Sequence, residues 1–191
     1  ANVDSVKSHH EISDVSEVKP VLKNAELLVR VNPINPGSKK EIDDVIDAGA
    51  DIVMLPMWKS VAEVSRFLRY VGGRVKTTLL LETKEAAECL DEVLGLGGFD
   101  EIHIGLNDLH LSYGLTFMFE LLSDGTVEKL CNKIAACGIP YGFGGIAGLG
   151  QGMLPAEKIL IEHYRLGSTR VILSRSFCDA DKIGDITGID N

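Results

Sequence analysis

Two acidic residues, Glu82 and Asp108, follow closely on short apolar runs of the kind found in buried parallel strands. The run before Glu82 spans 76–81, and the run before Asp108 spans 101–104 and ends at a glycine. Because α/β proteins present catalytic groups at the carboxyl ends of neighbouring strands, about 4.8 Å apart, these two carboxylates could share one small, hard cation. Mg²⁺ or Mn²⁺ suits such an all-oxygen site. Pairing of each acid with a basic residue is an equal alternative on spacing alone.

The segment 99–114 (FDEIHIGLNDLHLSYG) places four polar side chains just after its strand: Asn107, Asp108, His110 and Ser112. Asn107 and Asp108 could simply cap the next helix, as such residues often do. The second acid at an equivalent strand end favours a functional interpretation instead.

Arg30 is the third candidate, because it interrupts the apolar run 27–31, which we expect to be a buried strand. A buried arginine is costly unless it is paired. It could pair with an acid of the protein or with a carboxylate or enolate in a site, and its place near a strand end favours the site. His9 and His10 lie in a polar stretch, where a histidine pair is usually solvated; a loop, a tag remnant or part of an active site are all open.

The rest of the chain repeats one pattern, an apolar run followed by a helical segment, and predicts six β-α units. The expected strands are 27–31, 51–56, 76–81, 101–104, 139–143 and 170–173. Helices are expected to begin after Ser38 and Ser60 as N-caps, and then over 84–97, 115–122, 124–137 and 155–166. Gly72 should end the second of them.

This pattern predicts a TIM-type (β/α) barrel that is short at its amino end, since such barrels usually need about 250 residues. A doubly wound sheet of five or six strands is the second choice. We divide the chain into a polar arm (1–24), a barrel domain (25–177) and a tail (178–191).

A glycine-rich segment, 144–152, is expected to form a loop after the fifth strand. Such a loop could bind a phosphate or carboxylate through backbone amides, or it could be a tight turn without a ligand. Dinucleotide binding fits poorly, because the candidate acid, Glu162, falls inside a helix. We expect His163 and Tyr164 on that helix to be surface or interface groups, and the apolar stripe 117–119 to be core or subunit contact.

Composition excludes some classes of function. The chain has 191 residues, 45% of them hydrophobic, enough for one domain with a full core. Its net charge of -9, without a basic run, disfavours nucleic-acid binding. No apolar stretch has membrane-spanning length, so we expect a cytoplasmic protein that does not bind membranes.

Four motifs in order resemble the HpcH/HpaI aldolase and citrate lyase family. They are LVRVNP at 28–33, GADIVMLP at 49–56, LLET at 80–83 and IGLNDL at 104–109. Each motif is weak alone, but four in register make the resemblance fairly specific. It covers roughly 25–177 and implies a phosphoenolpyruvate/pyruvate-type TIM barrel, often homo-oligomeric.

The resemblance also implies roles for individual residues. Glu82 and Asp108 match the ligands of a divalent metal, Mg²⁺ or Mn²⁺, and Arg30 matches the arginine that steadies the enolate. Backbone amides around Gly105, Leu106 and Asn107 would hold the substrate carboxylate. The family's aldolase branch has a catalytic histidine in its first strands, a role that His10 (or its neighbour) could fill here.

Three hypotheses follow. The first is a metal-dependent lyase, an aldolase that cleaves a small 2-keto acid aldol through a pyruvate-like enolate. The second is a citrate-lyase-like enzyme acting on an acyl-thioester, although no basic patch is evident for the carrier. The third is a catalytically incomplete barrel that serves as a binding or assembly protein.

Overall fold

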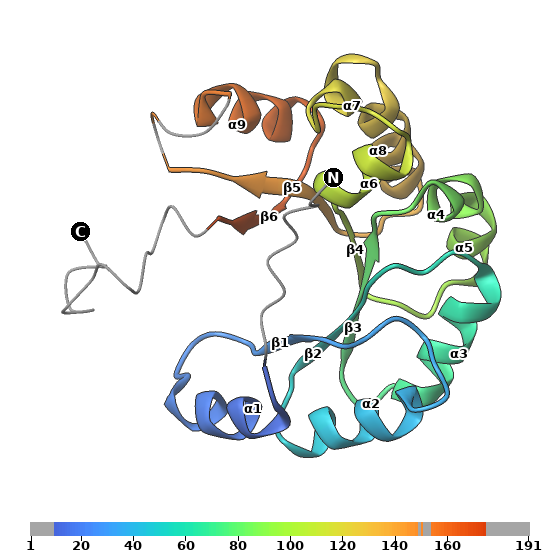
Figure 1. Ribbon diagram of the computed structural model, residues 1–191, viewed down its shortest axis with the longest axis vertical. Helices are drawn as coiled ribbons and strands as arrows, with labels where there is room; N and C mark the ends of the chain where they lie inside the picture. Colours follow the sequence, from blue (N-terminus) through green and yellow to red (C-terminus); the bar gives the residue numbers. More distant parts are fainter. Residues whose placement is uncertain (1–9, 149, 151–153, 175–191) are drawn as a thin grey trace.

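The computed structural model of the protein describes residues 10–148, 150 and 154–174. It is an α/β fold whose six strands form one parallel sheet, paired in the order in which they occur in the sequence. The strands are β1 (Leu28–Arg30), β2 (Ile52–Leu55), β3 (Lys76–Leu81), β4 (Glu101–Ile104), β5 (Tyr141–Ile146) and β6 (Arg170–Leu173). Figure 1 shows them along an arc, with the helices on its outer side. This arrangement is a half-barrel, consistent with part of a TIM-type barrel.

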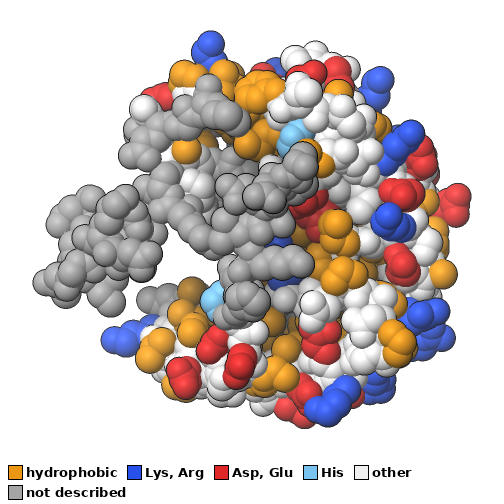
Figure 2. Space-filling model, in the orientation of Figure 1, with side chains coloured by type: hydrophobic (Ala, Val, Ile, Leu, Met, Phe, Trp, Pro, Cys, Tyr) orange, Lys and Arg blue, Asp and Glu red, His pale blue; other side chains and the backbone are white. Residues whose placement is uncertain are grey.

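The helices between the strands are mostly short. They are α1 (Ile12–Val18), the 3-10 turn η1 (Lys19–Val21), α2 (Ser38–Asp47), α3 (Val61–Val71), α4 (Lys84–Glu88), α5 (Leu90–Leu96), α6 (Leu106–Ser112), α7 (Glu120–Ser123), α8 (Thr126–Ala136) and α9 (Ala156–Arg165). No helix in the described ranges is long and apolar enough to cross a membrane. Acidic and basic side chains alternate around the helix-covered rim (Figure 2).

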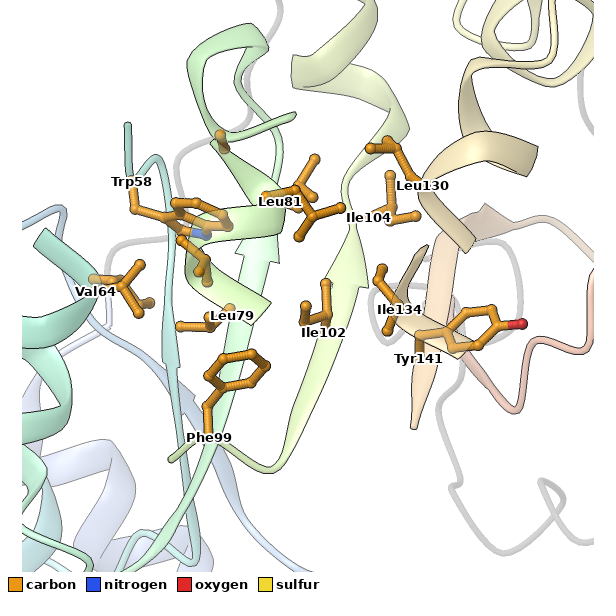
Figure 3. Packing of buried hydrophobic residues seen from close by; sticks show 14 of the residues in the cluster. Trp58, Val64, Leu79, Leu81, Phe99, Ile102, Ile104, Leu130, Ile134 and Tyr141 are labelled. Atoms are coloured by element: carbon orange, nitrogen blue, oxygen red, sulfur yellow. The ribbon is translucent and has the colours of Figure 1, made fainter. Parts of the chain in front are cut away.

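The main core lies between the sheet and the outer helices. Successive residues of a strand point to opposite faces. Leu79 and Leu81 of β3, with Ile102 and Ile104 of β4, therefore share the face that packs on the helices (Figure 3). All four are at most 1% exposed, and burying each side chain contributes about 1.5–3 kcal/mol. The alternate residues of the same strands point to the inner side of the arc.

The expectation of six β-α units is confirmed, and the expected doubly wound alternative is wrong. A doubly wound sheet reverses its strand order and carries helices on both faces. Here the order is sequential and the helices cover the outer side (Figure 1). The predicted arm, 1–24, contains α1 and η1, and the Lys19 ammonium donates to the Asp51 carboxylate at 2.6 Å. Residues 1–9 and the predicted tail, 178–191, lie outside the described residues.

The caps were predicted in part. The Ser60 hydroxyl accepts a hydrogen bond from the Glu63 amide at the start of α3, and Gly72 ends that helix in the left-handed conformation (φ +63°), as expected. Ser38 is not an N-cap; it is the first residue of α2, and its hydroxyl accepts from the Asn35 amide instead.

Four expected elements differ from the structure. The first strand is not buried: it is an edge in the described sheet, so Leu28 is 39% exposed and Arg30 is exposed. The expected helix 115–122 starts only at Glu120, because the Glu120 carboxylate holds the Phe117 amide in a turn at 2.8 Å. The expected helix 84–97 breaks at Cys89 into α4 and α5. The glycine-rich segment begins inside β5, because 145–146 pair with β6.

Candidate active site at the carboxyl ends of the strands

Glu82 directly follows β3 and points to the inner side of the half-barrel, where it is 4% exposed. Its direction follows from the strand alternation, since Leu81 faces the helix-side core. One carboxylate oxygen, Oε1, accepts the Met57 amide at 3.0 Å. Met57 lies in the loop after β2 with φ of +53°, a conformation that costs a non-glycine residue about 1–2 kcal/mol. The neighbouring unit thus supplies a strained loop that fixes Glu82.

The chain just after Glu82 is held by Thr83. Its hydroxyl donates to the Trp58 carbonyl at 2.7 Å and accepts from the Ala86 amide at 3.1 Å. The second bond caps α4, and the first ties that cap to the loop after β2. Hydrogen bonds therefore hold both the Glu82 carboxylate and the residue that follows it.

Asp108 reaches the same place from the next unit. It lies in the first turn of α6, directly after β4, and is half-buried. Gly105 links β4 to α6, and its amide donates to the Leu81 carbonyl at 2.9 Å. The Gly105 amide is therefore already used, so a ligand carboxylate at this helix start would have to take the amides of Leu106 and Asn107, which lack intrahelical partners in an α-helix. Asn107 is exposed beside them.

The two carboxylates influence each other directly. Burial, and then the negative charge of Asp108, raise the pKa of Glu82 to about 7; the Met57 hydrogen bond and the positive charge of Arg30 act in the opposite direction. Two acids this close hold either a proton or a cation between them at neutral pH. Their oxygens are the ligands that Mg²⁺ and Mn²⁺ prefer, so the residues present fit such an ion. No group of three or more His, Cys, Asp or Glu side chains gathers within the described ranges, so solvent or substrate would complete the coordination.

Arg30, at the end of β1, lines the same cavity and lies close enough to favour the ionised form of Glu82. In the part of the chain that the structure describes, it makes no ion pair within 4.0 Å. The alternative that Arg30 pairs with an acid as a purely structural bridge therefore has no support among these residues, and its guanidinium is free to meet an anion.

A cavity of about 400 Å³ joins these groups. Its polar lining comes from Arg30, Glu82, His103, Asn107, Asp108 and Ser174. Apolar side chains close the other side, and Gly105, Gly144 and Gly145 leave room at the wall. A cavity of this size suits a small molecule with an anionic or metal-chelating end.

Several lining residues were not identified as site residues from the sequence, among them His103, Met118 and Phe119. His103 alternates with Ile102 and Ile104, which face the helices, so the period of two was the signal that it faces inward. The expectation that 117–119 belongs to the core agrees with the packing of Met118 and Phe119 against the main core. Nothing in the sequence indicates that this segment also lies beside the carboxylates.

Other candidates lie elsewhere. His10 is exposed, its Nδ1 lies 3.2 Å from the Asp14 carboxylate, and it does not line the cavity; its catalytic role stays a prediction. His9 lies outside the described residues. His110 is buried with Nδ1 on the Leu106 carbonyl, and the Ser112 hydroxyl accepts the Lys84 amide.

His163 was expected to be a surface or interface group, but it is buried within the chain. It is 8% exposed and stacks on Phe143, with ring centroids 3.8 Å apart, because α9 turns this side chain onto β5. Its neighbour Tyr164 is 91% exposed, as expected for a surface group. Part of the glycine-rich segment, 149 and 151–153, lies outside the described residues, so its ligand-binding role stays a prediction.

Comparisons with known proteins agree with this architecture. Residues 4–142 match the family described as HpcH/HpaI aldolase/citrate lyase. No curated protein matches the sequence. Among solved structures, the chain is similar to the HpcH/HpaI aldolase from Desulfitobacterium hafniense DCB-2, with 18% identity and a TM-score of 0.67, over 87% of this chain and 73% of that chain.

Two further solved structures are similar. The citrate synthase SbnG has 16% identity and a TM-score of 0.68, over 86% of this chain and 71% of that chain. A citrate lyase from Burkholderia xenovorans LB400 has 13% identity and a TM-score of 0.67, over 90% of this chain and 62% of that chain. At these identities the likeness concerns the fold.

Proposed function

The chain belongs to the HpcH/HpaI aldolase/citrate lyase family, and from this premise we propose that it is a divalent-metal-dependent carbon–carbon lyase. Its substrate would be a small 2-keto acid aldol, cleaved to pyruvate, or a close analogue, and an aldehyde. The observation that carries the proposal is the meeting of Glu82 and Asp108 at the ends of adjacent strands, beside Arg30 in one cavity. Mg²⁺ or Mn²⁺ would be the cofactor, held by the two carboxylates.

The reaction divides between this ion and the protein. When bound, the metal supplies a Lewis acid that stabilises negative charge on the keto oxygen. Arg30 would donate hydrogen bonds to the same developing enolate from the β1 side of the cavity. The amides at the start of α6 would hold the carboxylate of the keto acid.

The carbon balance is that of an aldol cleavage. The C4 hydroxyl loses its proton, the C3–C4 bond breaks, and its electron pair forms the enolate of pyruvate. A proton added to C3 then gives the pyruvate methyl group. The groups around Glu82 serve the enolate half, which is common to every aldehyde partner.

An acyl-thioester substrate is the second candidate. The family description includes citrate lyase, and one structural neighbour bears that name. The two candidates differ in the molecule that forms the enolate, a free keto acid or an acyl-thioester. Metal-dependent exchange of the pyruvate methyl protons in heavy water separates them, because only the keto-acid enzyme should catalyse it.

A further inference from the structure

The inner face of β4 carries His103, which the chemistry proposed above leaves unused. His103 is 5% exposed and lines the cavity. It pairs in register with Leu80 of β3, two residues before Glu82, while Gly105 lies two residues after His103. Two successive side chains on the same face of a strand are two residues apart, which is about 6.6 Å. His103 therefore lies in the same cavity, nearer the amino ends of the strands than the carboxylates by about this distance. We call this part of the cavity its floor.

The hydrogen bond of His103 fixes which ring nitrogen carries the proton. Nε2 lies 2.9 Å from the Gly144 carbonyl oxygen. A carbonyl can only accept, so Nε2 is the donor and the neutral ring carries no proton on Nδ1. Burial lowers the pKa of His103 from its ordinary value, which keeps the ring neutral at pH 7. Nδ1 is then an acceptor.

The backbone conformation of Gly144 directs its carbonyl toward the His103 ring. It lies in the irregular part of β5, where the register with β6 shifts between Gly142 and Gly145, and its φ is +61°. A Cβ at Gly144 would lie 2.9 Å from Leu106 Cδ1, so only glycine fits here without a shift. The β5 irregularity therefore fixes the orientation of His103.

Nδ1 has no hydrogen-bond partner in the described parts of the chain. Among the described residues, the buried side-chain atoms that lack a partner are Trp58 Nε1 and His163 Nε2, so His103 Nδ1 is instead accessible from the cavity that its ring lines. A ligand or water in the cavity can therefore donate a hydrogen bond to it. A hydroxyl group is the simplest donor that a ligand of this size could present. Glu82 and Asp108, which line the other end of the cavity, would face the opposite end of such a ligand.

We propose that His103 is a substrate-binding residue whose Nδ1 accepts a hydrogen bond from a hydroxyl group of the ligand, so that the site prefers hydroxylated 2-keto acids to isosteric keto acids without a hydroxyl. This inference rests on the proposed function and names the specificity of its site. The preference would come from the floor of the cavity, while the carboxylates and Arg30 bind the part shared by both ligands.

Two isosteric ligands test this, 4-hydroxy-2-oxobutanoate and 2-oxopentanoate, which differ by a hydroxyl in place of a methyl group. Affinities are measured with Mg²⁺ by ligand-observed NMR on initial spectra, so that any slow cleavage does not enter. The intact protein should bind the hydroxylated acid about tenfold more tightly, the value of one net hydrogen bond. His103→Phe should lose this preference and keep its affinity for 2-oxopentanoate within about twofold. His163→Phe, a buried histidine outside the cavity lining, should retain the preference.

A second measurement uses the unchanged protein, so it does not depend on whether a variant folds. In protein labelled with ¹⁵N-histidine, the Nδ1 resonance of His103 should be that of an unprotonated nitrogen at pH 7. It should move on addition of 4-hydroxy-2-oxobutanoate and not on addition of 2-oxopentanoate. A resonance typical of a protonated Nδ1, or one that does not shift when the hydroxylated acid is added, would overturn the assignment.

The outcomes separate the two levels of the proposal. Equal binding of both acids by the intact protein, or an undiminished preference in His103→Phe, overturns the role of His103 and leaves the lyase proposal standing. If neither acid binds in the presence of Mg²⁺, both the role of His103 and the keto-acid lyase proposal are overturned.

Discussion

Gly105 and Glu82 are in contact across the ends of two adjacent strands, and the position of the carboxylate depends on it. A Cβ at residue 105 would lie 3.0 Å from both Cβ and Oε2 of Glu82. Real Cβ atoms rarely come this close, and Leu80 closes the remaining side at 3.3 Å. The glycine after β4 is therefore a requirement of the site.

Gly105→Ala should push the Glu82 carboxylate out of place. We expect Mn²⁺ affinity to fall by at least about tenfold, because displacing one of two charged ligands removes more than about 1.4 kcal/mol of binding. Titration of Mn²⁺ followed by electron paramagnetic resonance measures this. Gly95→Ala is the matched control, because no atom lies within 4 Å of its added Cβ and alanine favours the helix. Equal Mn²⁺ affinity in both variants would show that Gly105 does not position the ligand.

Glu82→Ala and Asp108→Ala should each abolish measurable Mg²⁺ or Mn²⁺ binding, because one remaining carboxylate is a weak ligand set for these ions. Calorimetric titration of the purified variants gives the affinities. Glu85→Ala is a suitable control, since Glu85 lies three residues on, in α4, and pairs at the surface with Lys59. Unchanged affinity in both site variants would reject the shared metal site.

The raised pKa of Glu82 should make stability depend on pH in the absence of metal. The folded protein keeps this proton up to about pH 7, whereas the unfolded chain releases it near 4.5. The folded state then binds more protons between these values, so the free energy of unfolding decreases as pH rises from about 4.5 to 7. The loss is at most about 3 kcal/mol, from 1.36 kcal/mol per pKa unit.

Urea unfolding of the protein and of Glu82→Gln across this range measures the effect. Glutamine resembles the protonated acid and does not titrate, so the variant should become relatively more stable as pH rises. A difference between the two proteins that stays constant from pH 4 to 8 would contradict the raised pKa.

Arg30→Lys should slow turnover more than it weakens metal binding. Lysine keeps the positive charge near Glu82 but loses the planar fork that donates two hydrogen bonds to an anion. We expect kcat to fall by about tenfold or more, with Mn²⁺ affinity nearly unchanged. Arg74→Lys, at an outer surface pair with Asp43, is the control. Turnover equal to that of the unchanged protein would remove Arg30 from the mechanism.

Local patterns predicted those parts of the fold that local physics determines. The period of two in the strands and the left-handed glycine at residue 72 are backbone properties, and β6 was predicted at its observed bounds, 170–173. The positions of Glu82 and Asp108 after adjacent strands could be predicted, because strand ends are visible in the sequence as a change from apolar to polar residues.

The remainder depends on particular side-chain contacts, some within a turn and some between residues far apart in the sequence. Whether Ser38 caps α2 depends on Asn35, and whether 115–119 is helical depends on the side chain of Glu120. His103 needed Gly144, forty-one residues away, to fix its ring, and His163 needed Phe143 to bury it. The exposure of Arg30 depends on which strand lies beside β1, and a single strand's pattern does not contain that information.

Proton exchange at the pyruvate methyl group in heavy water tests most directly whether Glu82 and Asp108 hold a metal for pyruvate enolisation. The measurement follows loss of the methyl signal by NMR, with and without Mg²⁺ or Mn²⁺, and needs no knowledge of the aldehyde partner. We predict exchange that requires the metal and disappears in Glu82→Ala. Absence of exchange in a protein with proven metal binding would contradict the keto-acid lyase.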